Sequence, residues 1–186
     1  TETWFKGLDR VYNNFVYDFL YPDPTSVLAF IENHDTDRFL GEGDNLPMLK
    51  QASTLLLTTR RIPQLYYGTE IMMNGVKSKS DGYVRKDFPG GWSDDKANAL
   101  TAAGRTKLQN ECYNFYKTLL NWRKGNEVIA KGNMTQFMVQ HGVYAYARQY
   151  NGKTVFVMLN GTDEATTLPL KYMSLIHISE PTRPEP

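Results

Sequence analysis

The stretch that decides the fold is Ser26-Val27-Leu28-Ala29-Phe30-Ile31-Glu32, followed at once by the polar run Asn33-His34-Asp35-Thr36-Asp37-Arg38. The first run is short and almost entirely apolar, which favours a parallel strand buried on both faces over an amphipathic one. A second run of this kind, Ile62-Pro63-Gln64-Leu65-Tyr66-Tyr67-Gly68, carries its proline near the start, where a missing N–H matters least.

The segment between these runs is predicted to be a helix. Pro47 fits a first helical turn, and apolar residues recur on one face from Met48 to the basic pair Arg60-Arg61. Strand, helix and strand within about 45 residues form a parallel βαβ unit, whose crossover is expected to be right-handed.

Two further helices flank this unit. Apolar residues at helical spacing predict a helix over Leu8–Leu20, which the sequence Tyr21-Pro22-Asp23-Pro24 ends. A capping box, Thr106-Lys107-Leu108-Gln109, opens a helix over Thr106–Lys124 that Gly125 closes. The residues from Ile71 to Arg105 show no periodicity, and long loops of this kind are usually functional or disordered.

From Gly132 the apolar period changes to two. Met134–Val139, Val143–Tyr150 and Thr154–Asn160 alternate as strands do, and Asn151-Gly152 is a strong type I′ hairpin signal. A small antiparallel sheet is therefore expected after the α/β part, with the boundary near Asn126.

Composition excludes several classes of protein. The 186 residues are 41% hydrophobic and 22% charged, which is ordinary globular usage. Lys and Arg total 21 against 20 acidic residues, so no net field favours nucleic acid as a partner. No apolar run approaches the ~18 residues of a membrane-spanning helix. The single Cys112 cannot close an internal disulfide, and the histidines lie too far apart for a local zinc motif.

His34 and Asp35 are the first candidates for a functional site. They follow a predicted parallel strand, and ligands meet such sheets at the carboxyl ends of their strands. Neighbouring residues in a strand point to opposite faces, so both side chains reach one pocket only if pairing has ended by Asn33. The alternative is that Asn33 and Asp35 only bond backbone groups in a turn.

The second strand end and the long loop supply further candidates. Tyr66 and Tyr67 either stack on a ligand or pack as core, and core is favoured for one of them. Glu70 is either a site carboxylate or a partner of Arg60 or Arg61. Arg85, Asp87 and Trp92 combine an aromatic face with polar groups, which suits sugars. A loop without a ligand would also use Gly90-Gly91 simply to turn.

These residues resemble a known family. Phe30-Ile31-Glu32-Asn33-His34-Asp35 resembles the fourth conserved region of the α-amylase superfamily (glycoside hydrolase family 13), and residues 62–70 resemble the segment on its eighth barrel strand. With Arg85-Lys86-Asp87-Phe88-Pro89-Gly90-Gly91-Trp92 and Asn121-Trp122-Arg123-Lys124-Gly125, they are similar to the neopullulanase and cyclomaltodextrinase-like branch. The resemblance covers Thr1 to Met173.

The resemblance implies an α/β fold: the C-terminal part of a (β/α)8 TIM barrel, followed by a partial antiparallel β-sandwich. Ser26–Asn33 and Ile62–Gly68 would be strands 7 and 8, with their helices. Residues 1–125 would close the catalytic barrel and 126–173 would start the all-β domain. Ser174–Arg183 resembles the in-frame translation of a sequencing adapter, so residues 174–186 are set aside, and the alternative is a genuine disordered tail. A barrel needs about 250 residues, so earlier strands would lie upstream.

The resemblance also implies an activity, that of a retaining α-glucan hydrolase. Its aspartate nucleophile and glutamic acid would stand on the missing strands, and Glu2-Thr3-Trp4 is read as a chance likeness to the acid. Asp35 would bind the sugar at the cleavage point, with His34 beside it, and stabilise the transition state. The chain alone is expected to be inactive. The implied substrate contacts are Arg38, Tyr67, Arg85, Asp87 and Trp92.

The resemblance leaves alternatives open. The parent protein could be a transglycosylase or glucosyl isomerase on the same scaffold, or a glucan-binding relative without activity. An α-glucan oligosaccharide or polysaccharide is the expected partner. Calcium often accompanies the family, but Asp81, Asp94 and Asp95 have no ligand spacing, so no metal ligand is assigned. A periplasmic or extracellular bacterial location is what the family favours.

Overall fold

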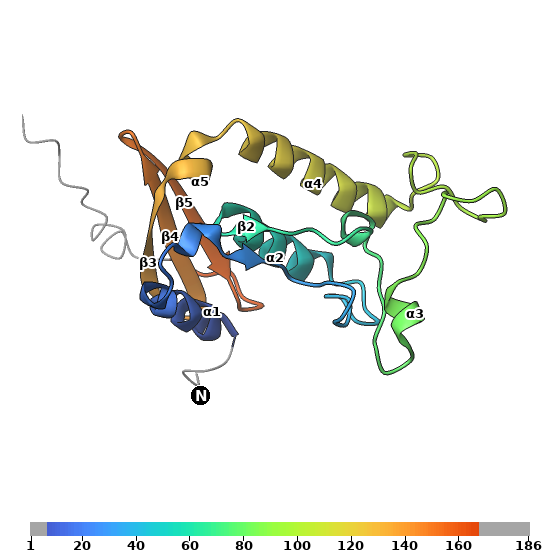
Figure 1. Ribbon diagram of the computed structural model, residues 1–186, viewed down its shortest axis with the longest axis horizontal. Coiled ribbons are helices and arrows are strands. Elements are labelled where there is room, and N and C mark those ends of the chain that lie inside the picture. Colours follow the sequence, from blue (N-terminus) through green and yellow to red (C-terminus); the bar gives the residue numbers. More distant parts are fainter. Residues whose placement is uncertain (1–6, 168–186) are drawn as a thin grey trace, which may run out of the picture.

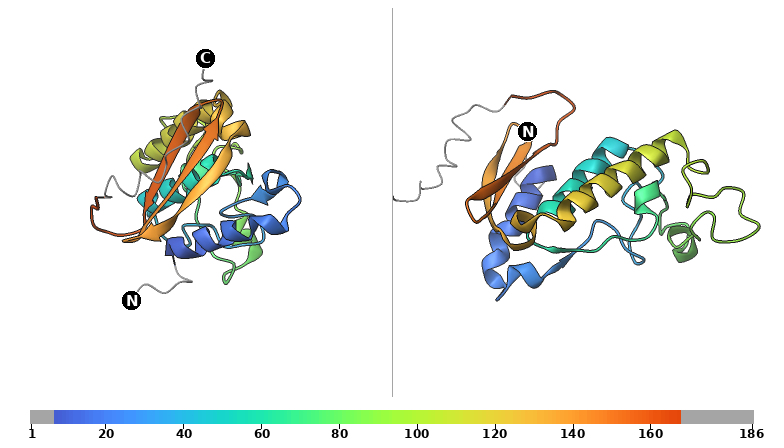
Figure 2. Two further views of the ribbon diagram at one scale, coloured as in Figure 1. Left: turned by 90° about the vertical axis from the view of Figure 1, so that its left-hand side faces the viewer. Right: turned by 90° about the horizontal axis from the view of Figure 1, so that it is seen from above.

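The computed structural model describes residues 7–167 of the chain. An antiparallel sheet, formed by β3 (Asn133–Gln140), β4 (Val143–Tyr150) and β5 (Lys153–Asn160), lies at one end of the molecule (Figures 1 and 2). Two helices, α2 (Leu46–Thr58) and α4 (Lys107–Lys124), run away from it side by side, and α3 (Asp81–Val84) with its loops lies at the other end. Within the described residues, no helix is both long and apolar enough to cross a bilayer.

The parallel βαβ unit is present, but its strands are short. β1 (Leu28–Ala29) pairs in parallel with β2 (Ile62–Pro63), and α2 (Leu46–Thr58) connects them. The prediction of strands over 26–33 and 62–68 was therefore too long. Ser26, which was expected to begin the first strand, instead ends a 3-10 helix over Pro24–Ser26. In the described part of the chain, β1 and β2 pair only with each other.

Burial of the first strand on both faces is also not observed. Leu28 is 52% exposed and Phe30 is 43% exposed. In residues 7–167, β1 and β2 have only each other as neighbours, so the outer edge of each strand is unpaired. A two-stranded pair of this size leaves apolar side chains uncovered, and its unpaired edges are places where further strands can add.

The helices follow their local signals. α1 (Gly7–Val16) continues as a 3-10 helix over Tyr17–Leu20. The position of the predicted helix 8–20 is therefore confirmed, but its last four residues are 3-10 and not α-helical. α4 (Lys107–Lys124) has the predicted capping box, in which the Thr106 hydroxyl and the Gln109 side chain each accept the other's backbone N–H.

The core between α2 and α4 is built from the apolar stripes of the two helices and from Leu40, which lies in the loop before α2. Its buried members are Leu40, Leu46, Leu49, Leu57, Cys112 and Tyr116. The Tyr116 hydroxyl is hydrogen-bonded to buried Ser53 of α2, which satisfies both polar groups inside the core. This packing fixes the helix that connects β1 to β2.

The predicted antiparallel sheet and its Asn151-Gly152 hairpin are both confirmed. β3 (Asn133–Gln140), β4 (Val143–Tyr150) and β5 (Lys153–Asn160) pair antiparallel in chain order. Asn151 and Gly152 both have positive φ, as a type I′ turn requires. α5 (Glu127–Lys131) precedes the sheet and was not predicted, since five residues are too few to show a helical period.

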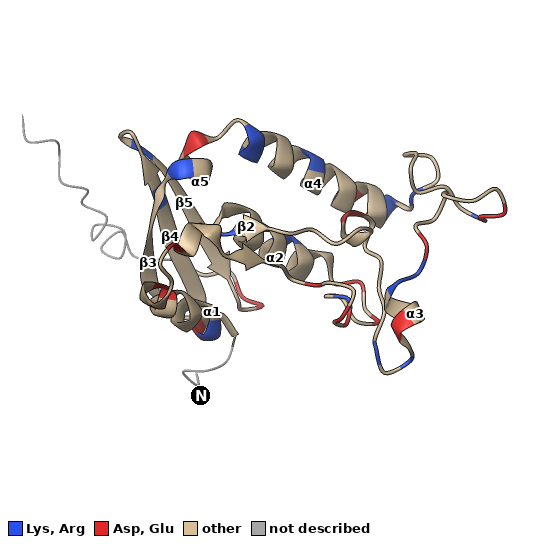
Figure 3. Ribbon diagram, in the orientation of Figure 1, with Lys and Arg blue, Asp and Glu red and all other residues tan. Residues whose placement is uncertain are grey.

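The long stretch after β2 contains two short elements that the sequence did not reveal. Thr69–Ile71 forms a 3-10 helix, and α3 (Asp81–Val84) is a single turn that Ser80 caps. Charged residues of both signs alternate over α3 and the loops around it (Figure 3). Glu2-Thr3-Trp4, residues 168–173 of the expected β domain and the tail 174–186 lie outside the described residues.

Candidate functional site

A tight turn follows β1 and presents two neighbouring side chains to solvent. The Asn33 side-chain oxygen accepts the backbone N–H of Asp35 at 2.8 Å, and the Asn33 N–H donates to the Thr36 hydroxyl at 3.0 Å. Regular pairing has ended by this point, so residues 34 and 35 are free of the strand alternation. Asn33 is thus the turn-forming residue, and the Asp35 carboxylate is not used by the turn.

The side chains of His34 and Asp35 emerge together. His34 Nε2 lies 3.2 Å from Asp35 Oδ2, and the two side chains are 60% and 63% exposed. Arg85, which follows α3, reaches both residues: its Nε donates to the His34 carbonyl at 3.0 Å and its Nη2 lies 3.1 Å from Asp35 Oδ1. Three predicted site residues therefore form one exposed cluster.

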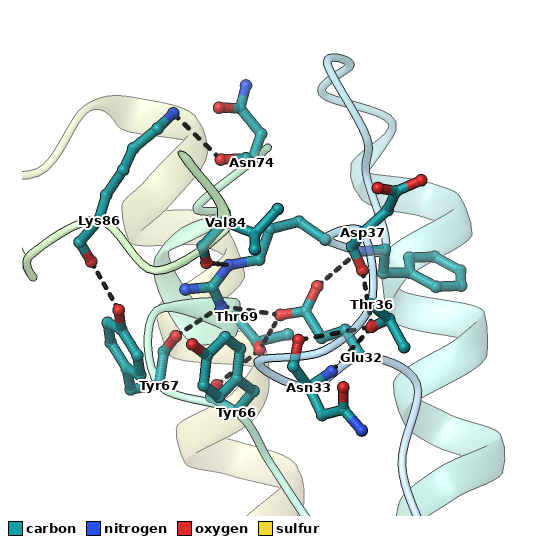
Figure 4. Close-up of polar contacts among 12 residues, drawn as sticks. Glu32, Asn33, Thr36, Asp37, Tyr66, Tyr67, Thr69, Asn74, Val84 and Lys86 are labelled. Atoms are coloured by element: carbon teal, nitrogen blue, oxygen red, sulfur yellow. Dashed lines mark hydrogen bonds and ion pairs between the residues drawn. The ribbon is translucent and has the colours of Figure 1, made fainter. Parts of the chain in front are cut away.

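A buried ion pair supports this turn from beneath. Arg38 Nη1 lies 3.2 Å from Glu32 Oε1, with both side chains almost fully buried (Figure 4). The Glu32 carboxylate also accepts the Thr69 hydroxyl and the Phe39 backbone N–H. A buried carboxylate with these partners locks the two chain segments after β1 and β2 to each other.

The Arg38 guanidinium reaches a third segment. Its Nε donates to the Val84 carbonyl of α3 at 3.0 Å, and Nη1 donates to the Tyr67 carbonyl at 2.7 Å. Tyr66 covers it, with the ring centroid 4.0 Å from the guanidinium carbon. Arg38 is buried, so in this structure it positions the loops that surround the turn and does not present its charge to solvent.

Tyr67 lies at the edge of this network. Its ring meets that of Tyr66 edge-on, with centroids 4.7 Å apart, and its hydroxyl donates to the Lys86 carbonyl at 2.7 Å. Burial is the main cause that raises the pKa of the Tyr67 hydroxyl. Tyr67 is 39% exposed, so part of its side chain remains open for contact.

Asp87 and Trp92 lie on the following loop and stay exposed. Trp92 is 66% exposed, and its backbone N–H and that of Gly90 both donate to Asp95. These bonds lower the pKa of the Asp95 carboxyl. Among the described residues, neither the Asp87 nor the Trp92 side chain forms a hydrogen bond or ion pair with the His34, Asp35 and Arg85 cluster.

Two buried acidic residues, Asp18 and Glu32, were not predicted from the sequence. Asp18 pairs with both Arg60 and Arg61, so the ion pair considered between these arginines and Glu70 is not formed. Asp18 lies in the 3-10 extension of α1, where a helical wheel gives no sign of a buried acid. The structural role of Glu32 was also missed. Glu32 ends an apolar run, and an acidic residue in that position must have a partner if it is buried, so this pattern could have revealed its role.

A metal centre is not built by the described part of the chain. No group of three or more His, Cys, Asp or Glu side chains gathers there in a way that could hold an ion.

Comparison with known proteins identifies the fold. Residues 134–178 match the family model described as the cyclo-malto-dextrinase C-terminal domain. The chain is 32% identical over 160 residues to a cyclomaltodextrin glucanotransferase of Thermoanaerobacterium thermosulfurigenes, covering 86% of this chain and 19% of that protein. It is 31% identical over 154 residues to an alpha-amylase of Niallia circulans, covering 83% of this chain and 25% of that protein.

Solved structures agree. An alpha-amylase from Geobacillus thermoleovorans, complexed with acarbose, matches 84% of this chain and 32% of its own with a TM-score of 0.66 and 26% identity. A gamma-cyclomaltodextrin glucanotransferase from an alkalophilic Bacillus clarkii matches 83% of this chain and 20% of its own, with a TM-score of 0.62 and 26% identity. This chain therefore shares its fold with the corresponding part of both structures.

The chain belongs to the α-amylase superfamily, glycoside hydrolase family 13. It spans between 16% and 25% of the length of the curated relatives it matches.

Proposed function

We propose that the chain is the closing portion of a (β/α)8 catalytic barrel and the start of the β domain that follows it. β1 and β2 would be barrel strands 7 and 8. Residues 1–125 would belong to the barrel and 126–173 to the all-β domain, and 174–186 would be a tail foreign to both. The parallel βαβ unit, the uncovered strand edges and the small share of each relative that is matched support this proposal.

The proposed activity of the parent protein is the cleavage of α-glucans with retention at the anomeric carbon. The observation that carries it is the exposed Asp35 carboxylate at the end of a parallel strand, paired with His34 and Arg85. In that position Asp35 would hold the 2- and 3-hydroxyls of the sugar at the scissile bond, with His34 beside it. Such hydrogen bonds strengthen as the ring flattens toward an oxocarbenium ion, so they lower the barrier by several kcal/mol.

The remaining chemistry needs groups outside this chain. A retaining enzyme uses two carboxyl groups about 5 Å apart, one as nucleophile and one as acid and then base. We place both on the upstream strands, so the 186-residue chain would bind but not cleave. Arg85, Tyr67, Asp87 and Trp92 would form part of the wall of the substrate cleft, and Arg38 would hold the loops that carry them.

The proposed substrates are maltodextrin, pullulan or cyclodextrin, with α-1,4 and in some cases α-1,6 bonds. The match of residues 134–178 to the cyclo-malto-dextrinase C-terminal domain supports hydrolysis in the neopullulanase and cyclomaltodextrinase-like branch. A second candidate is transfer to a sugar acceptor, since the relatives include cyclomaltodextrin glucanotransferases. Water and a sugar acceptor would compete for the same covalent intermediate.

The experiment is to express the longer coding sequence that contains this chain, with Asp35→Asn and Asp44→Asn compared. Asp44 is an exposed carboxylate without a side-chain partner among the described residues, so its variant should keep full activity. Asp35→Asn should lower kcat on maltodextrin about a thousandfold, which corresponds to about 4 kcal/mol of lost transition-state stabilisation. An active Asp35→Asn enzyme would refute the role. Product analysis with added glucose separates hydrolysis from transfer.

A further inference from the structure

A hollow of about 730 Å³ lies far along the chain from the Asp35 turn, between the end of α4 and the β4–β5 hairpin. Helix α4 contributes Trp122, the α4–α5 connection contributes Asn126, and the hairpin contributes Tyr150, Lys153 and Thr154. A second hollow of about 240 Å³ adjoins the same hairpin and shares Tyr150, Lys153 and Thr154 with the first. The surface is therefore hollowed on a scale that suits a small or chain-like ligand.

The lining combines aromatic rings with free polar groups. Trp122 is 41% exposed and lies in the last turns of α4, the helix that packs on α2. Tyr150 is partly buried, with the Lys131 ammonium 5.6 Å from its ring centroid. Among the described residues, the side chains of Asn151, Lys153 and Thr154 make no hydrogen bond or ion pair, so they are free to bond a ligand.

Charge narrows the class of ligand. Glu127 and Lys153 are the charged residues of the larger hollow, and Lys131 lies 2.7 Å from Glu127, so one net positive charge remains around it. A single excess charge gives only a weak field for a nucleic acid or an anionic lipid surface. Aromatic faces beside amide, hydroxyl and ammonium donors match a sugar, whose C–H faces are apolar and whose edges carry hydroxyls.

We propose that this hollow is a second carbohydrate-binding site, separate from the Asp35 cluster, and that it takes an α-1,4-linked glucan chain. Trp122 and Tyr150 would stack on sugar rings, while Asn151, Lys153 and Thr154 would bond their hydroxyls. The choice of an α-glucan rests on the proposed function, whereas the hollow and its chemistry do not. The site would tether a polymer to the protein at a distance from the bond being cleaved.

The test is a titration of the full 186-residue chain with maltohexaose, followed by the 15N resonances of the Trp122 indole and of the Lys153 and Thr154 amides. These signals should move together. Trp122→Ala should weaken this binding about tenfold or more, and Trp122→Phe, which keeps an aromatic face, should retain most of it. Cellohexaose, the β-linked control, should bind more weakly.

Two matched variants separate this site from the proposed catalytic one. Trp92→Ala and Asp35→Asn should leave the titration of the Trp122 indole unchanged, since neither residue lines the hollow. If Trp122→Ala binds maltohexaose as tightly as the wild type, the second site is wrong, whatever Asp35→Asn does. Movement of resonances around Asp35 alone, with the Trp122 indole unmoved, would also overturn it.

Discussion

The Glu32 carboxylate and the Arg38 guanidinium form a buried ion pair 3.2 Å long directly beneath the exposed His34–Asp35 turn. Through this pair the segment after β1 is bonded to Thr69, to the Tyr67 carbonyl and to the Val84 carbonyl of α3. The exposed cluster thus stands on a rigid polar base, and a site built in this way holds its geometry before a ligand arrives.

Replacing Glu32 by Gln should be strongly destabilising. The change removes one charge of a buried pair and leaves the Arg38 guanidinium uncompensated, which costs about 3–5 kcal/mol. Urea unfolding followed by near-UV circular dichroism measures the loss. The double variant Glu32→Gln, Arg38→Met should lose less than the sum of the single changes, because the charge left without a partner is gone. A single-variant loss below about 1 kcal/mol would contradict the role given to the pair.

Asp18 should matter to stability nearly as much as Glu32. It is buried and accepts hydrogen bonds from Arg60 and Arg61, joining the end of α1 to the segment that enters β2. Asp18→Asn keeps the shape but removes the charge, and we expect a loss of about 3 kcal/mol in the free energy of unfolding. Asp44→Asn serves as the exposed control and should change it by less than about 0.5 kcal/mol. Equal effects of the two variants would show that the Asp18 pairing adds nothing.

The elements with strong local signals were predictable from the sequence. The capping box at Thr106, the Asn151-Gly152 turn and the alternation over Val143–Tyr150 each specify their structure within a few residues. The strands around Leu28 and Ile62 were predicted too long because a strand needs a partner, and partners are set by tertiary contacts that a local pattern does not contain.

The site was predictable in its exposed part and not in its support. His34 and Asp35 directly follow an apolar run, and this was sufficient to propose that they lie at the end of a strand. The contact of Arg85 with Asp35 depends on how the long loop folds, which the sequence pattern does not show. The pairing of Glu32 with Arg38 joins residues six apart around a turn, and that of Asp18 with Arg61 spans 43 residues. Buried polar pairs of this kind follow from three-dimensional packing, which periodicity does not encode.

The N-cap of α4 should contribute a measurable share of stability. The Thr106 hydroxyl accepts the Gln109 N–H at 3.2 Å, and Thr106→Ala removes that acceptor from a helix that packs on α2. The expected loss is about 1 kcal/mol in the free energy of unfolding, measured by urea denaturation. Thr106→Ser keeps the hydroxyl and is the matched control. If Thr106→Ser lowers the free energy of unfolding as much as Thr106→Ala does, the loss comes from the missing methyl group and not from the missing cap.

Alkaline pH should destabilise the chain through its buried thiol and phenols. Burial raises the pKa of the Cys112 thiol from its usual 9.0 to about 12, and it also raises the pKa of the Tyr116 and Tyr146 hydroxyls. The unfolded chain loses these protons first, so the stability that they contribute is complete below pH ~9 and falls as the pH rises toward 12. Urea unfolding at a series of pH values from 8 to 11 measures the fall. Cys112→Ala should show a shallower decline, because the thiol no longer titrates.

The reactivity of Cys112 tests its burial separately. In the native chain at pH 8, a thiol reagent should modify Cys112 more slowly than in the unfolded chain, and equal rates would contradict a buried, protonated thiol.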